Sequence, residues 1–178
     1  MMMKKMAGVL AIVLLLAGPA MAAISIENDF TDGAFRVTVE SVVAPTNGEY
    51  KYSYTILPSS TSNVQWLSIS LTPGVVITDM GVQSGTGEPV IWTLVNGPGG
   101  SSMDAVFTAT VPAGSTSATV WFTSPQYYTI APAAASGIND GMYAAVTGQV
   151  LSPVPEPATL AMLGLGAVLF SVNRKRHR

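Results

Sequence analysis

Hydrophobic and polar side chains alternate with a period of two in many short runs between residues 23 and 153, and hardly anywhere with the period of a helix. The clearest run is residues 35–40, in which every second position is Phe or Val and the others are charged or carry a hydroxyl. Residues 50–56 repeat the pattern after a Pro-Thr-Asn-Gly turn at 45–48. Such alternation is typical of strands with one buried face. The two runs predict a hairpin with a somewhat long loop.

Further strand candidates follow, separated by clusters of Pro, Gly, Asn and Ser. In residues 64–71 the alternation changes phase between Trp66 and Leu67, as a β-bulge would make it do. Residues 131–135 suit a helix, but Pro132 lies inside this short stretch. Short strands at this spacing predict an all-β, antiparallel two-sheet β-sandwich, with a jelly roll as the alternative. The other candidates are residues 75–80, 90–95, 105–111, 119–123, 127–130 and 142–150.

The first 22 residues have the features of a signal peptide. Lys4 and Lys5 precede an apolar run at 6–17, and small residues follow at Ala20 and Ala22. The apolar run is shorter than the about 20 residues that a membrane span needs. We expect a signal peptidase to cut after Ala22, or alternatively one residue later, and the mature chain to begin outside the cytoplasm.

The last 25 residues have three parts: Val154-Pro155-Glu156-Pro157, an apolar run at 158–172, and a basic tail of Arg174, Lys175, Arg176, His177 and Arg178. As a helix the apolar run would be about 23 Å long, short of the hydrocarbon core of about 30 Å, a gap that snorkelling arginines and local thinning can close. The basic tail favours a cytoplasmic C-terminus. We therefore expect a single transmembrane helix at 158–172, with the β-domain at 23–153 outside the inner membrane.

This three-part C-terminus resembles the PEP-CTERM sorting signal of exported bacterial proteins. The resemblance rests on Val154-Pro155-Glu156-Pro157, the apolar run after it and the basic tail at 174–178. It implies that an exosortase, a membrane-embedded cysteine protease and transpeptidase, removes the tail in bacteria that make extracellular polysaccharide. It makes this chain a processing substrate, transiently held in the inner membrane and then moved to the cell envelope or the extracellular space.

Charge and composition exclude several kinds of chemistry. Residues 23–153 contain nine acidic side chains but only Arg36 and Lys51 as bases, so this part is strongly acidic and is not expected to bind nucleic acid. The chain has no cysteine, and its single histidine, His177, lies in the basic tail. A cysteine nucleophile and a Ser-His-Asp triad are therefore excluded.

A few residues remain as candidates for binding. Asp29 and Asp32 are a weak calcium candidate, although their spacing does not follow an EF-hand loop. Trp92 alternates with apolar neighbours and is expected in the core, whereas Trp121 lies on the polar side of its strand. Trp121 and Tyr127 are thus the weak candidates for stacking on a sugar.

Together these features predict an exported, non-catalytic protein of the cell surface or of a biofilm matrix, with a structural or adhesive role and no cofactor. One alternative is a carbohydrate-binding module for extracellular polysaccharide. A weaker one is a hydrolase that uses two converging carboxylates, although the sequence selects no pair among the nine acids.

Overall fold

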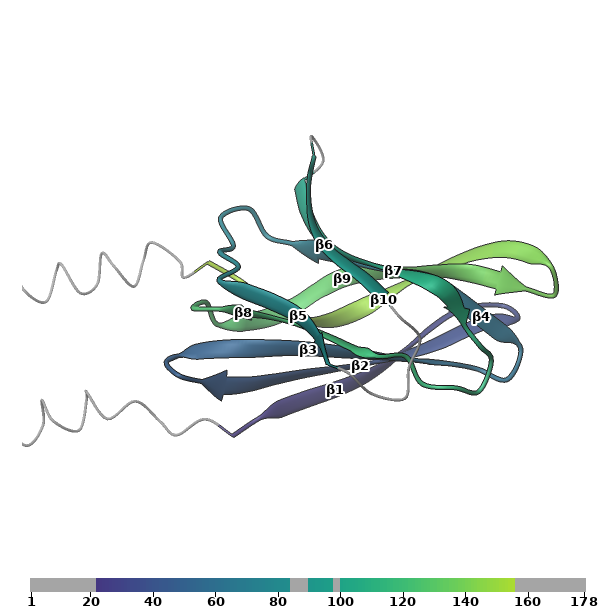
Figure 1. Cartoon of the computed structure of the whole chain (residues 1–178), viewed down its shortest axis with the longest axis horizontal. Helices are drawn as coiled ribbons and strands as arrows, with labels where there is room; N and C mark the ends of the chain where they lie inside the picture. Colours follow the sequence, from purple (N-terminus) through teal and green to yellow (C-terminus); the bar gives the residue numbers. More distant parts are fainter. Residues whose placement is uncertain (1–21, 84–89, 98–99, 156–178) are drawn as a thin grey trace, which may run out of the picture.

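A computed structural model describes residues 22–83, 90–97 and 100–155, whose regular elements are ten β-strands in two antiparallel five-stranded sheets (Figure 1). The first sheet has the order β1-β2-β3-β8-β5, and the second has the order β10-β9-β4-β7-β6. The prediction of an all-β, two-sheet antiparallel fold is therefore confirmed. The strands are β1 (Ile24–Asp32), β2 (Phe35–Thr46), β3 (Glu49–Pro58), β4 (Ser62–Leu71), β5 (Asp79–Gln83), β6 (Val90–Gly97), β7 (Gly100–Val111), β8 (Thr119–Ser124), β9 (Tyr128–Asn139) and β10 (Met142–Pro153).

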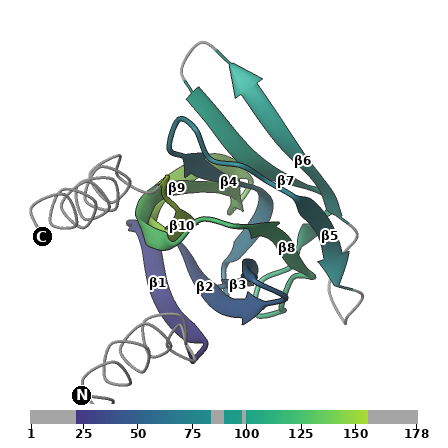
Figure 2. The ribbon, with the colours of Figure 1, turned by 90° about the vertical axis from the view of Figure 1, so that its left-hand side faces the viewer.

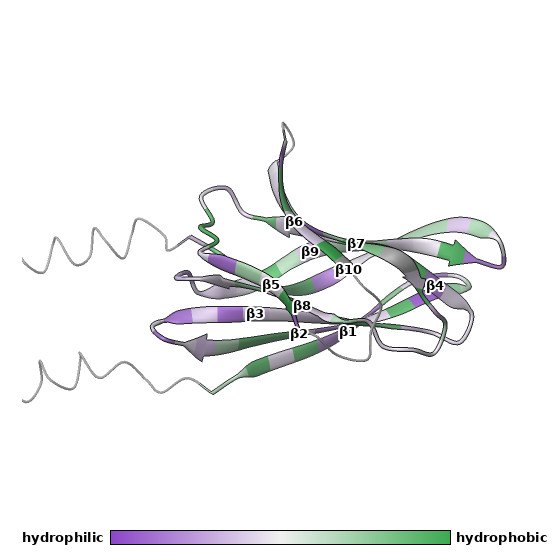
Figure 3. Cartoon of the chain, viewed as in Figure 1, coloured by the Kyte–Doolittle hydropathy of each residue, from purple (hydrophilic) through white to green (hydrophobic). Residues whose placement is uncertain are grey.

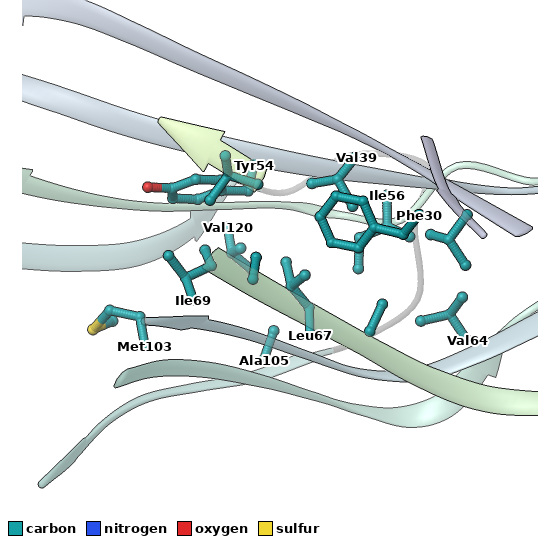
Figure 4. Close-up of a cluster of buried hydrophobic side chains, with 14 of the residues drawn as sticks. Phe30, Val39, Tyr54, Ile56, Val64, Leu67, Ile69, Met103, Ala105 and Val120 are labelled. Atoms are coloured by element: carbon teal, nitrogen blue, oxygen red, sulfur yellow. The ribbon is translucent and has the colours of Figure 1, made fainter. Parts of the chain in front are cut away.

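The core lies between the two sheets and is built by the period-two alternation, which can be followed along β1 in Figure 3. Val39, Tyr54 and Ile56 of the first sheet face Leu67 and Ile69 of the second (Figure 4). Each fully buried aliphatic or aromatic side chain of this kind contributes about 1.5–3 kcal/mol relative to an exposed one. Trp92 is also buried, as its alternation predicts.

One long side of the sandwich is closed because β1 and β10, the edge strands of different sheets, lie side by side (Figure 2). The Asn28 side-chain amide donates a hydrogen bond to the Gln149 carbonyl over 2.8 Å. Gly148 makes the close approach possible, since a Cβ there would lie 2.1 Å from the Phe30 ring. The first and last described strands thus hold the two sheets together.

Tight turns set the register of two hairpins. Between β2 and β3, Asn47 and Gly48 have φ values of 46° and 85°, and between β9 and β10, Asp140 and Gly141 have 48° and 80°. Two consecutive positive φ angles are typical of the two-residue type I′ turn. The predicted hairpin of residues 35–40 and 50–56 is confirmed, but its loop is this short turn because both strands extend to Thr46 and Glu49.

Three strand predictions need correction. Residues 24–32 form β1, which the sequence pattern did not predict. Of the candidate at 75–80, residues 75–78 form a loop and only its last two residues belong to β5. Residues 128–139 are one continuous strand, so 131–135 are extended, and the pairing of β9 with β4 begins at Ala133, directly after Pro132.

The predicted bulge in residues 64–71 is present, but slightly earlier in the strand. The register of β4 shifts between Val64 and Trp66 against both neighbouring strands. Against β9, Gln65 is the additional residue, whereas against β7 the additional residues lie on β7, between Val106 and Val111. The inward-facing set of β4 changes from Val64 to Leu67.

The chain enters and leaves the sandwich at the same end, called here the exit end. It is made by the described termini at 22–23 and 154–155, the β2–β3 turn, the loop at 72–78 and the β8–β9 turn at 125–127 (Figure 1). In the described part of the chain, no helix is long and apolar enough to cross a membrane. The expected signal peptide before Ala22 and the expected transmembrane helix at 158–172 lie outside the described residues.

Candidate functional site: a groove over Trp121

A groove of about 430 Å³ lies on the outer face of the first sheet, near the exit end. Its floor comes from three neighbouring strands, since Lys51 of β3 is opposite Thr123 of β8, which is opposite Asp79 of β5. In the next row of the sheet, Ser53, Trp121 and Gly81 are neighbours in the same order. The groove is lined by Thr46, Asn47, Glu49, Lys51, Thr78, Asp79, Trp121 and Thr123.

Trp121 is the aromatic residue of this groove, and its indole ring is held in a defined place. A Cβ at position 81 would lie 2.8 Å from the ring, so the glycine lets the indole pack against the backbone of β5. The Lys51 ammonium lies over the ring, 4.3 Å from its centroid, as in a cation–π contact. The ring is half-buried, and a ligand that stacks on it has to displace the flexible lysine side chain.

Hydroxyl and carboxylate groups surround the ring. The Thr78 hydroxyl donates a 2.7 Å hydrogen bond to the Glu49 carboxylate and lies 2.8 Å from the Thr123 hydroxyl. The Asp79 carboxylate accepts a 2.9 Å hydrogen bond from the backbone N–H of Met80. An aromatic surface bordered by such groups suits a ligand with apolar faces and many hydroxyls, which is the chemistry of a sugar.

Tyr127, the second predicted stacking residue, lies outside this groove. It belongs to the exit end, where its ring stacks on Tyr128 at 4.4 Å and meets the Tyr50 ring edge-on at 5.6 Å. Tyr127 is 40% exposed. The structure therefore does not bring Trp121 and Tyr127 together in one aromatic strip.

Asp29 and Asp32, the calcium candidates, lie near the far end of β1. Asp29 pairs with Arg36, and its other carboxylate oxygen accepts a 2.6 Å hydrogen bond from the Thr38 hydroxyl. The Thr38 hydrogen bond and the Arg36 guanidinium hold the pKa of the Asp29 carboxyl below its usual value. Both oxygens of this carboxylate already have partners, and among the described residues no three acidic or histidine side chains gather where they could hold a metal.

The first half of the predicted sorting motif is packed against the domain. The Val154 N–H donates a 2.8 Å hydrogen bond to the Tyr127 carbonyl. Pro155 packs on Gly74, where a Cβ would lie 3.4 Å from the proline ring. Ala22 is the first described residue and is exposed. The remaining predicted processing residues, Ala20, Glu156, Pro157, Arg174, Lys175, Arg176 and Arg178, lie outside the described residues.

Sequence reasoning did not find the polar residues of the groove. Alternation places Lys51 and Thr123 on the polar face of their strands, but it does not show that β8 pairs with both β3 and β5. Glu49 and Asp79 line the same groove only because β8 lies between β3 and β5.

Comparisons with known proteins support the C-terminal part of the sequence interpretation. The family model described as the PEP-CTERM protein-sorting motif matches residues 153–176. No curated protein and no solved structure matches the chain. The match begins at Pro153, the last residue of β10. The chain thus carries a PEP-CTERM sorting signal, which implies an exported protein that is targeted to an exosortase.

Proposed function

We propose that the chain is a structural or adhesive protein of the cell surface or extracellular matrix, without a catalytic task. Its precursor is held in the inner membrane by residues 158–172, and the exosortase then frees the β-domain for the envelope or the matrix. The order of the segments along the chain supports this proposal. The sorting motif directly follows the last strand of a self-contained β-domain, without an intervening linker.

Adhesion takes place through carbohydrate at the Trp121 groove. The observation that carries this proposal is the indole ring on the outer face of the sheet, bordered by Thr78, Thr123 and two carboxylates. The domain is strongly acidic, so an anionic polymer is repelled and a neutral polysaccharide is the preferred ligand.

The test is binding of neutral polysaccharides to the processed protein, measured by affinity electrophoresis and tryptophan fluorescence. Trp121→Ala is expected to weaken binding about tenfold, equivalent to about 1.4 kcal/mol. Lys51→Ala uncovers the ring and is expected to keep or strengthen binding. Tyr127→Ala is the matched aromatic control outside the groove and is expected to bind normally. Equal binding by the wild type and Trp121→Ala would contradict this proposal.

The weaker alternative, a carboxylate-dependent hydrolase, has Glu49 and Asp79 in the same groove in its favour. Both side chains already accept hydrogen bonds from the protein, which suits a binding surface better than a pair of free catalytic groups. The hydrolase alternative predicts that the protein releases reducing ends from the bound polymer and that Glu49→Gln or Asp79→Asn abolishes this release. Such a result would show that the function is hydrolysis and not adhesion. We expect no release.

A further inference from the structure

The surface of the exit end carries little charge and exposes several apolar residues. Of its described side chains, only that of Glu49 is charged, and this carboxylate accepts a hydrogen bond from Thr78 on the side of the groove. The expected cleavage after Ala22 adds the positive α-amino group of Ala23. Val76 is 50% exposed and Tyr127 is 40% exposed. The other exposed residues of this end are Ala22, Ala23, Asn47, Gly48, Pro73, Gly74, Thr78 and Pro125.

This surface is held rigidly by one glutamine. The Gln126 side-chain amide accepts a 2.8 Å hydrogen bond from the Val76 N–H and donates a 2.9 Å bond to the Gly74 carbonyl. The Gln126 carbonyl accepts a 2.7 Å bond from the Tyr52 hydroxyl in the interior. The loop at 72–78 and the β8–β9 turn therefore present Val76 and Tyr127 in a fixed arrangement.

The sequence places this end close to the apolar run. Ala158 is only three residues beyond Pro155, which is itself packed on Gly74. Three residues span at most about 10 Å. The polar layer on each side of a bilayer is about 5–8 Å thick. A chain anchored by residues 158–172 thus cannot hold the exit end far from the lipid headgroups.

We propose that the exit end rests on the headgroup layer of the membrane in the unprocessed precursor, with Val76 and Tyr127 as its contacts. Tyrosine is favoured in this layer, because its ring is apolar and its hydroxyl is polar. The inference rests on the proposed membrane-held precursor and adds to it an orientation of the domain. The Trp121 groove then faces sideways, parallel to the membrane, and the exit end is uncovered only when the exosortase cuts.

The test uses the chain from residue 23 to its C-terminus, reconstituted in vesicles of phosphatidylethanolamine and phosphatidylglycerol. The natural chain has no cysteine, so single cysteines at Val76→Cys and Tyr127→Cys can be labelled with an environment-sensitive fluorophore. Tyr143→Cys is the matched control, because Tyr143 is a 71% exposed aromatic residue at the opposite end. Quenching by lipids that carry a spin label near the headgroup reports contact.

We expect strong quenching at positions 76 and 127, at least threefold above that at 143, and an unchanged near-ultraviolet circular dichroism spectrum in all three variants. Equal, weak quenching at the three positions in protein that floats with the vesicles would overturn the orientation alone. Protein that fails to float would overturn the membrane-held precursor as well. A Val76→Asp variant provides a second measurement, since a charge at this position is expected to lower quenching at 127.

Discussion

At the scale of single residues, Asp29 was a candidate calcium ligand, but its carboxylate is occupied by contacts within the protein. Its two carboxylate oxygens are used by Arg36 and Thr38, two side chains of the neighbouring strand β2. Both partners stabilise the ionised form, so the carboxylate strengthens the pairing of β1 with β2.

The pH dependence of stability tests this role. The folded state holds the pKa of Asp29 below the usual 3.8, so its contribution is complete at neutral pH and is lost as the pH falls below that value. Asp29→Asn is expected to lower the thermal midpoint slightly at neutral pH and to lower it less at the most acid pH at which the domain stays folded, because wild-type Asp29 takes up its own proton as the pH falls through the lowered pKa. Asp32→Asn is the control without these partners. A loss of equal size at both pH values would contradict the assignment.

The position of the Trp121 indole also depends on a neighbouring residue. Gly81 has no side chain and therefore leaves room for the ring. The sequence predicted correctly that Trp121 lies on the outer face, since alternation within one strand decides that. It did not predict Lys51 over the ring, because β3 and β8 are far apart in the sequence and only their pairing brings the two side chains together.

At the scale of elements, alternation predicted a strand wherever inward positions are large and outward positions are polar, as in β2 and β3. It missed β1 because Asn28 interrupts the inward row, and this side chain instead donates to the Gln149 carbonyl. It missed the extent of β9 because the alanines of 131–135 are apolar on both faces and show no period. It mistook Val75 and Ile77 for a strand, since these loop residues pack on the core.

The bulge of β4 depends on Gly137 of β9. A Cβ at this position would lie 1.9 Å from the Asn63 carbonyl oxygen, so the two strands approach more closely than any side chain permits. Gly137→Ala is expected to destabilise the domain by about 1–3 kcal/mol or more, because backbone must move rather than a flexible side chain. Urea unfolding measures this change.

Gly33→Ala is the comparison for that measurement. Its added Cβ meets no atom within 4 Å, and only the positive φ of 61° is unfavourable. Its cost should stay near 1 kcal/mol. If Gly137→Ala proved no more destabilising than Gly33→Ala, the close approach at the bulge would be wrong.

At the scale of the whole molecule, the sorting signal and the proposed binding groove lie in different parts of the chain. The sorting signal is local in the sequence and was predictable residue by residue, whereas the Trp121 groove requires the order of strands in the first sheet. The two features meet at the exit end, where Val154 and Pro155 are packed against the domain. Cleavage within the motif leaves every strand of the sandwich intact.

The central claim is that an exosortase processes this exported chain, and mass spectrometry of the intact protein from the envelope and medium of a native host tests it most directly. The account predicts a product that begins at residue 23 and ends near residues 153–157 in the wild type. In a strain without the exosortase it predicts retention of the residues up to 178. An intact C-terminus in both strains would contradict the account and make the chain a permanently anchored membrane protein.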